Sequence, residues 1–257
     1  MKTLSILTTT ILLFSACNST PPPNNHTVVD VTIPKSESLN FSHPNISIPS
    51  DSSQLLFVTT SNWSAKNGTL QRYERVTTDE AKWVKIGEPI TIILGRNGLG
   101  WGRGLHTIPT NAKYVKREGD GKAPAGLFYL GNAFGYEDFR IDFPYEVYKT
   151  TDHCVDDSHS QWYNKIVDSK KVTKDYKSFE HMRLKNNLYR YGITVNHNPN
   201  QIKNAGSCIF MHIRSDNGKG TAGCTAMKEN KLTNLLIWLK KEAKPLLLQL
   251  PKSELRN

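Results

Sequence analysis

The chain has 257 residues, of which 37% are hydrophobic and 22% are charged, and its formal net charge is +10. This length suits one sizeable domain with a small additional lobe. A basic balance is typical of nucleic-acid binding, yet the basic residues are scattered and no nucleic-acid recognition motif is present, so we expect no nucleic-acid partner. The charge indicates either a solvated basic surface or attraction to an anionic polymer or lipid of the cell envelope.

The first residues, MKTLSILTTTILLFSACNST, have the pattern of an export signal. Lys2 precedes an apolar stretch at residues 4–14, which is too short to span a bilayer as a mature helix. Ser15 and Ala16 before Cys17 resemble the bacterial lipoprotein box, so we predict a signal peptide at 1–16 and lipidation of Cys17. A plain secretory signal with an incidental Cys17 is the alternative. With either signal the protein is expected in the cell envelope or periplasm. If Cys17 is lipidated, the lipid also anchors the protein to a membrane.

Three further regions are expected after the signal. Residues 17–52 are rich in Asn, Ser, Thr and Pro and are predicted to form a flexible tether. Residues 53–251 form the predicted domain, with a loop-rich insertion at 132–190. No other stretch is long and apolar enough to cross a bilayer.

The first half of the domain contains strand-like runs joined by turns. The Asn67-Gly68 pair predicts a hairpin turn, and residues 116–130 lead from a charged turn into a strand. The glycine-rich segment 95–106 lacks both the Lys-Ser/Thr ending and the following helix of a phosphate loop, so we interpret it as a close-packed loop. The predicted strands before it are 55–63, 70–76, 83–86 and 90–94.

The second half begins irregularly and ends with regular elements. Residues 132–190 are rich in aromatic and charged side chains and are predicted to form long loops and short helices over the sheet. Strands are expected at 188–198, 209–214 and 246–250. In the second of these strands Ile209, Met211 and Ile213 share one face, while Phe210, His212 and Arg214 share the other. Leucines at helical spacing predict a helix after Cys224, namely Leu232, Leu235, Leu236 and Leu239. The fold is therefore expected to be mostly β with one helix.

The segment CIFMHIRSDNGKGTAGCTAM, residues 208–227, places two cysteines and a histidine close together. A zinc site would use Cys208, His212 and Cys224 with Cys154 as the fourth ligand. This spacing is not a common zinc pattern, and thiolate zinc sites are unusual in exported proteins, so no metal or other cofactor is expected. With Cys17 outside the domain, two of the other three cysteines can pair, and the third is a candidate reactive thiol.

Cys224 is the strongest candidate for that thiol. It follows Gly223 at what we predict to be the start of a helix, where backbone amides lower a thiol pKa. A glycine-containing loop can bring His212 beside it as a base, and the Gly223 and Cys224 amides would form an oxyanion site. Cys154 and Cys208 would then pair and brace the insertion. The alternative is that Cys224 is a small buried apolar residue and His212 a core histidine.

These residues resemble the L,D-transpeptidase (YkuD-type) family of bacterial cell-wall enzymes. The family motif has a histidine on a strand, a short loop and then Ser/Thr-His-Gly-Cys, which His212, Thr221, Gly223 and Cys224 match. Ala222 replaces the second histidine, and Thr225-Ala226 replaces the usual Ile/Val-Arg. KREGDGKAPAGLF is similar to the family's Thr-Pro-x-Gly-x-Phe segment, with Ala123 in place of Thr. The resemblance covers residues 55–250.

The resemblance implies a β-sandwich-like catalytic domain that acts on the stem peptides of peptidoglycan. Cys224 would attack the bond between an L-centre and D-alanine, release D-Ala and hold a thioester until an amine attacks it. His212 would move the protons, with its ring oriented by a backbone carbonyl. Tyr191 and His197 would line the cleft or only pack beside it, and Arg214 is a further candidate for substrate binding.

Two alternatives to transpeptidation remain open. Water could attack the same thioester, which would make the protein an L,D-carboxypeptidase. The protein could also be a tethered, non-catalytic lipoprotein that binds the cell wall, although the presence of both Cys224 and His212 disfavours this. A papain-like protease is disfavoured because its cysteine precedes its histidine by a long interval.

Overall fold

The computed structural model describes residues 38–39, 41–76, 79–215 and 217–255. The predicted signal peptide, Cys17 and the tether up to residue 37 lie outside the described residues. The described part belongs to one compact unit, which spans Ser36–Asn257. Within it, no helix is long and apolar enough to span a bilayer.

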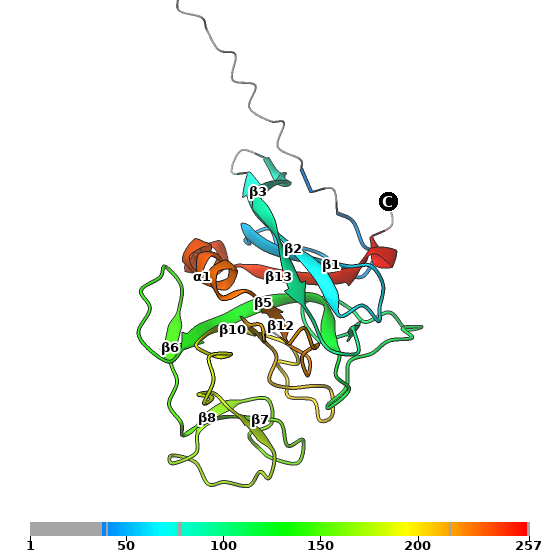
Figure 1. The fold of residues 1–257 in the computed structure, drawn as a ribbon. Coiled ribbons are helices and arrows are strands. Elements are labelled where there is room, and N and C mark those ends of the chain that lie inside the picture. Colours follow the sequence, from blue (N-terminus) through cyan, green and yellow to red (C-terminus); the bar gives the residue numbers. More distant parts are fainter. Residues whose placement is uncertain (1–37, 40, 77–78, 216, 256–257) are drawn as a thin grey trace, which may run out of the picture. The chain divides into compact units, whose positions relative to one another are not determined.

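The main element is a sheet that closes on itself (Figure 1). The strands pair in the order β10-β11-β12-β3-β2-β1-β13-β5, and β5 also pairs with β10, which completes the ring. β4 and β6 attach to β5 outside the ring. The strands of the ring are β1 (Gln54–Thr60), β2 (Asn67–Val76), β3 (Asp79–Ile93), β5 (Ala123–Gly135), β10 (Tyr191–Val195), β11 (Phe210–Ile213), β12 (Thr225–Met227) and β13 (Leu246–Pro251). β4 is Leu99–Trp101 and β6 is Tyr145–Val147. The expectation of a mostly β fold is confirmed, in the form of one continuous ring of strands.

The hairpin between β1 and β2 turns earlier than predicted. Gly68 pairs with Thr60 inside the ladder, so the Asn67-Gly68 pair belongs to the strand and the turn lies at residues 61–66. A Cβ at Gly68 would lie 2.8 Å from the Thr59 carbonyl oxygen, which shows that this glycine serves close strand packing. The predicted turn was therefore wrong, although the hairpin itself is present.

The predicted strands 83–86 and 90–94 form one long strand, β3. The irregularity between them is a bulge opposite Gln71, and Gly87 has φ 63 there. The Gln71 side-chain amide donates to the carbonyl oxygens of Ile86 and Gly87 at 3.2 and 3.1 Å. The side chain therefore satisfies backbone groups that the bulge removes from the ladder.

The two faces of the ring strands carry different clusters. Met211, Ile213 and Met227 join the main core, which fills the ring together with side chains of β1, β5 and β13. Phe134, Phe210 and Cys224 belong to a second cluster. The predicted alternation along β11 is confirmed, because Ile209, Met211 and Ile213 all lie in the main core.

One α-helix, α1 (Glu229–Trp238), packs against β10 and β11. Leu232, Leu235 and Leu236 are fully buried in the main core, as the leucine spacing predicted. Two short 3-10 helices, η1 (Lys241–Ala243) and η2 (Lys252–Glu254), flank β13.

The insertion at 132–190 contains a small second sheet. Its strands pair in the order β8-β7-β9 and appear at the bottom of Figure 1. They are β7 (Asp152–Val155), β8 (Ile166–Asp168) and β9 (Phe179–His181). The short helices predicted here were wrong, since residues 132–190 contain no helix.

The predicted tether does not extend to residue 52. Ile46 is buried in the main core, and Phe41 and Ile48 pack against it. The Arg75 guanidinium donates to the carbonyl oxygens of Pro49 and Ser52 at 2.8 and 2.7 Å. The polar composition concealed these few apolar anchors, so residues 41–52 are part of the folded unit.

Candidate functional site

Two neighbouring strands bring His212 and Cys224 into one region. β11 and β12 run parallel, with Met211 opposite Thr225 and His212 opposite Ala226. Cys224 immediately precedes β12, and α1 begins only at Glu229. The prediction that Cys224 lies at the start of a helix was therefore wrong, and no helix N-terminus lowers its pKa.

The turn before Cys224 is organised by Thr221. The Thr221 hydroxyl donates to the Cys224 carbonyl oxygen at 2.6 Å and accepts from the Gly223 amide at 3.2 Å. A Cβ at Gly223 would lie 3.0 Å from the Lys122 carbonyl oxygen, so glycine allows the close approach here. Since the Gly223 amide is engaged by Thr221, only the Cys224 amide of the expected oxyanion pair has no partner among the described residues. Ala222 lies in the same turn and forms none of these bonds.

Cys224 is a closed thiol in this conformation. Its side chain is 5% exposed, and it is the one free cysteine among the described residues. Sγ accepts from the Phe210 amide at 3.3 Å and donates to the Cys208 carbonyl oxygen at 3.6 Å. Burial raises the pKa of the thiol, and the Glu180 carboxylate raises it further. The sequence argument for a lowered pKa was therefore wrong for this conformation.

His212 is buried and oriented as a neutral base. Its Nδ1 lies 2.8 Å from the Ile213 carbonyl oxygen, which can only accept, so Nδ1 carries the proton and Nε2 carries the lone pair. Nε2 has no hydrogen-bond partner among the described residues. Burial lowers the pKa of His212 to about 4, so the ring is neutral at neutral pH. It packs at 5.1 Å from the Tyr189 ring.

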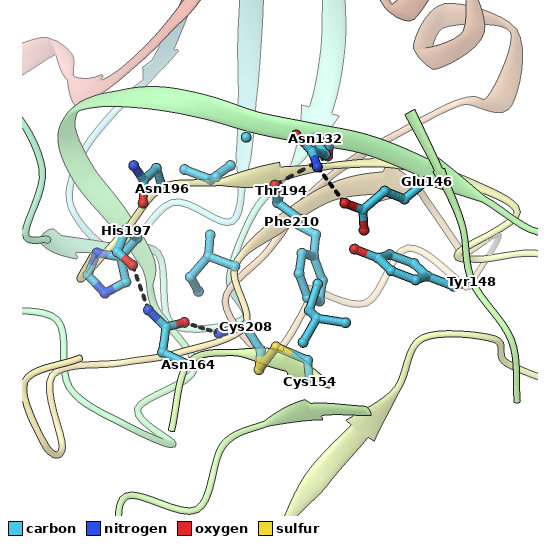
Figure 2. A pocket seen from close by; sticks show the side chains of 14 residues that line it. Asn132, Glu146, Tyr148, Cys154, Asn164, Thr194, Asn196, His197, Cys208 and Phe210 are labelled. Atoms are coloured by element: carbon cyan, nitrogen blue, oxygen red, sulfur yellow. Dashed lines mark hydrogen bonds between the residues drawn. A yellow bond between two sulfur atoms is a disulfide. The ribbon is translucent and has the colours of Figure 1, made fainter. Parts of the chain in front are cut away.

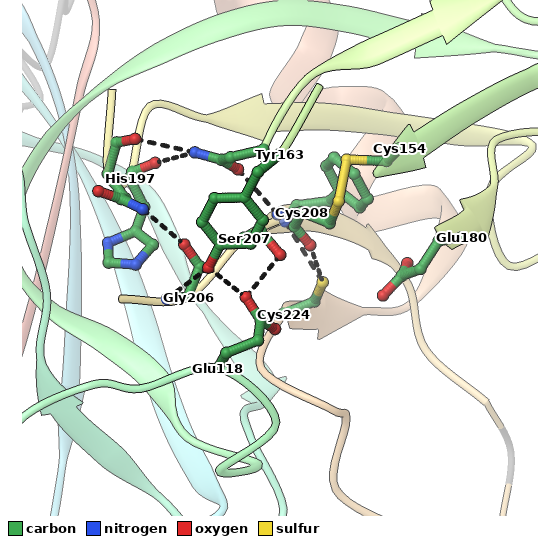
Figure 3. Close-up of a disulfide and its surroundings, with 12 residues drawn as sticks. Glu118, Cys154, Tyr163, Glu180, His197, Gly206, Ser207, Cys208 and Cys224 are labelled. Carbon is green, nitrogen blue, oxygen red and sulfur yellow. Dashed lines mark hydrogen bonds between the residues drawn. A yellow bond between two sulfur atoms is a disulfide. The ribbon is translucent and has the colours of Figure 1, made fainter. Parts of the chain in front are cut away.

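The predicted disulfide between Cys154 and Cys208 is confirmed. It joins β7 of the insertion to the segment before β11, across a sequence separation of 54 residues. Cys208 therefore links the insertion to the thiol directly, because its carbonyl oxygen accepts from Cys224 Sγ. Figure 3 shows this arrangement.

The surroundings of Cys224 include charged and phenolic groups that the sequence did not single out. The Tyr189 hydroxyl donates to Glu180 at 2.6 Å, and burial raises the pKa of that carboxyl. Glu118 accepts from the hydroxyls of Tyr163 and Ser207. Of the two carboxylates, both labelled in Figure 3, Glu180 is the one that acts on the Cys224 thiol and raises its pKa. The insertion that carries Glu180 has no regular pattern, so no sequence signal pointed to it.

A hollow of about 430 Å³ lies beside the Cys154–Cys208 disulfide (Figure 2). It shares Cys208 and Phe210 with the surroundings of Cys224, but Cys224 itself is not part of its lining. The rest of the lining mixes apolar residues, among them Ile166, Val195 and Ile209, with polar ones, the aromatic ring of Tyr148 and one carboxylate, Glu146. The polar lining residues are Asn132, Asn164, Thr194, Asn196 and His197.

The other predicted binding residues lie in different places. His197 lines the hollow but is 2% exposed: Nδ1 accepts from the Arg103 amide at 3.2 Å, and Nε2 lies 3.0 Å from the Ala205 carbonyl oxygen. Burial lowers its pKa to about 3, so it is a neutral packing residue. Tyr191 packs at 5.2 Å from the Phe139 ring. Arg214 lines a separate depression with Lys228 and Glu229.

The described residues contain no group of three or more His, Cys, Asp or Glu side chains suited to holding a metal ion. Comparisons of the chain with family models, with curated proteins and with solved structures found no match.

Proposed function

We propose that this protein is a cysteine-dependent acyltransferase of the L,D-transpeptidase type that acts on peptidoglycan stem peptides. The observation that carries the proposal is that His212 lies on β11, while Cys224, the one free cysteine among the described residues, immediately precedes the parallel strand β12. The resemblance of the segment around Cys224 to the YkuD-type motif supplies the substrate class. The export signal and the disulfide agree with a location in the cell envelope.

His212 is neutral and can accept a proton, although the pKa of about 4 that burial gives it makes it a weak base until the site opens. Its Nδ1 proton is held by the Ile213 carbonyl oxygen, so Nε2 is free to take a proton at neutral pH. In the proposed reaction Cys224 gives its proton to Nε2, and the thiolate attacks the carbonyl carbon before D-Ala. The C–N bond then breaks, His212 returns the proton to the departing amine, and a thioester remains on Cys224.

The resting conformation must open for this reaction. The thiol hydrogen is directed to the Cys208 carbonyl oxygen, away from a base, and Sγ has little exposed surface. The adjacent hollow has a volume typical of small-ligand sites, and its amide and hydroxyl lining suits a peptide backbone. We place the donor peptide there, so that its arrival displaces the wall formed by Cys208 and Phe210.

Hydrolysis is the second candidate outcome of the same thioester. The burial of Cys224 and His212 favours transfer, because a site that excludes water protects an acyl-enzyme until an amine arrives. A non-catalytic wall-binding role would not require a free thiol and a neutral imidazole on neighbouring segments of one sheet.

The test is mass spectrometry of muropeptides after incubation with the full chain. Tetrapeptide stems should lose D-Ala and appear as cross-linked dimers, whereas trimmed tripeptides alone would indicate a carboxypeptidase. Cys224→Ser should abolish both products because a serine hydroxyl is far less acidic than a thiol and, without ionisation, is a poor nucleophile at neutral pH. Glu88→Gln, at an exposed position on β3 outside the hollow, is the control for folding and should keep D-Ala release. Continued D-Ala release by Cys224→Ser would exclude the proposed nucleophile.

A further inference from the structure

Two side chains of opposite charge act on Cys224 from distant parts of the chain. Glu180 lies on β9 of the insertion, and Lys116 lies in the segment before β5. Both belong to the electrostatic surroundings of the thiol: the carboxylate raises the pKa of Cys224 and the ammonium lowers it. Neither residue belongs to the motif around the nucleophile.

Glu180 is held in place through Tyr189. The Tyr189 hydroxyl donates to Glu180 Oε2 at 2.6 Å. The Tyr189 ring packs at 5.1 Å from His212 and at 5.6 Å from Phe210, whose amide donates to Cys224 Sγ. The carboxylate is therefore connected by direct contacts to the surroundings of both proposed reacting groups.

Lys116, which precedes Cys224 by more than 100 residues in the sequence, is held by groups close to it in the chain. It is 4% exposed, and its ammonium donates to Asp120 Oδ1 at 2.7 Å and to the Arg117 carbonyl oxygen at 2.6 Å. A Cβ at Gly223 would lie 3.8 Å from Lys116 Cε, so the lysine stem passes beside the turn that carries Cys224. A buried and anchored cation at this turn can support a negative charge on the neighbouring sulfur.

The other titratable groups near the thiol do not supply the charges that raise or lower the pKa of Cys224. His212 is neutral because burial lowers its pKa to about 4. Tyr189 stays protonated, since burial and then the nearby Cys224 raise its pKa well above the usual value. Glu118 and Asp156 act on Glu180, whose carboxyl pKa is raised by burial first and by these two acids in addition.

We propose that Glu180 and Lys116 are opposed positioning residues for Cys224, the carboxylate holding back ionisation of the thiol and the ammonium supporting it. The inference rests on the proposed function only in treating Cys224 as the nucleophile. Its consequence is that the resting thiol is restrained by charge as well as by burial, and that a ligand that neutralises or displaces Glu180 releases it.

The experiment measures the rate of alkylation of Cys224 by iodoacetamide against pH in the full chain. The reagent is neutral, and peptide mass spectrometry separates Cys224 from Cys17. Glu180→Gln should lower the pH midpoint by about one unit, so that alkylation on the rising limb is about tenfold faster. Lys116→Met should raise the midpoint by a similar amount. Glu88→Gln removes a carboxylate from an exposed position on β3 and should match the unmodified protein.

Tyr189→Phe distinguishes charge from loosened packing. It keeps the carboxylate but removes its hydrogen bond from Tyr189, so the midpoint should fall less than in Glu180→Gln, whereas a looser wall would raise the rate at all pH values. A Glu180→Gln profile that coincides with that of Glu88→Gln would overturn the inference, even if Lys116→Met fails to fold. If the buried thiol of the unmodified protein resists alkylation up to pH 10, a Glu180→Gln variant that reacts no faster there would overturn the inference as well. If Glu180→Gln shifts the pH profile of Cys224 alkylation but the unmodified protein forms no muropeptide product, the inference stands and the proposed function is rejected.

Discussion

His212 and Cys224 have the residue identities that acyl transfer needs, and each is held by backbone groups. The Ile213 carbonyl oxygen selects the tautomer of His212, while the Phe210 amide and the Cys208 carbonyl oxygen hold Cys224 Sγ. No carboxylate is needed to orient the imidazole, since a carbonyl oxygen already accepts from Nδ1. The proposed pairing of His212 with Cys224 thus depends on backbone geometry as much as on the two side chains.

His212→Asn tests the proposed base. Asparagine can still donate to the Ile213 carbonyl oxygen but cannot take a proton, so the rate of D-Ala release should fall by about 100-fold or more. The pH profile gives the second readout, because activity that needs the neutral ring should decline as pH falls through about 4 in the unmodified protein. An unchanged rate in His212→Asn, with circular dichroism showing an intact fold, would remove His212 from the mechanism.

At the scale of elements, the sequence predicted periodic segments well and irregular segments poorly. The alternation in β11 and the leucine spacing in α1 correctly indicated their buried faces, since each pattern reports burial directly. The Asn67-Gly68 pair was misread because a glycine also serves close strand packing. The short strand β12 was missed because its three residues, Thr225–Met227, are too few to show a period.

The candidate site was predictable only where it lies on regular strands. The pairing of Cys154 with Cys208 followed from assigning the other cysteines, and the structure confirms it. Glu180 and Tyr189 were not foreseen because they lie in the insertion, where long-range contacts and not local pattern determine position. The raised pKa of Cys224 was missed for the same reason, since it arises from burial under that insertion.

The disulfide is expected to stabilise the insertion and the wall over Cys224. A Cys154→Ala/Cys208→Ala variant should lose about 2–4 kcal/mol of unfolding free energy, because the cross-link closes a long loop in the unfolded chain. Urea titration of the full chain measures this loss. Cys224→Ala is the matched control, as it removes a buried cysteine without breaking the cross-link. A double variant as stable as the unmodified protein would show that packing against the ring of strands holds the insertion in place without the disulfide.

For the molecule as a whole, the buried histidines make stability depend on pH. Burial lowers the pKa of His212 to about 4 and that of His197 to about 3, below the ordinary value of 6.5. The unfolded chain therefore binds more protons than the folded chain once pH falls below about 6.5, so stability is lost as pH falls. Glu180 acts in the opposite direction, because its raised carboxyl pKa favours the folded state on protonation.

Comparison with His212→Asn isolates one histidine from these opposing effects. From pH 7.5 to pH 5 the unmodified protein should lose about 2 kcal/mol more unfolding free energy than the variant, since asparagine does not titrate. Urea titrations at the two pH values measure the difference. Equal losses in the two proteins would mean that His212 becomes charged without cost and is not buried as described.

The most direct measurement of the proposed chemistry is the intact mass of the protein after brief exposure to a tetrapeptide muropeptide. We expect an adduct with the mass of the donor minus D-Ala, located on the peptide that contains Cys224 and absent from Cys224→Ser. No adduct under conditions that trap thioesters, or an adduct that persists in Cys224→Ser, would contradict the assignment of this protein as a cysteine acyltransferase.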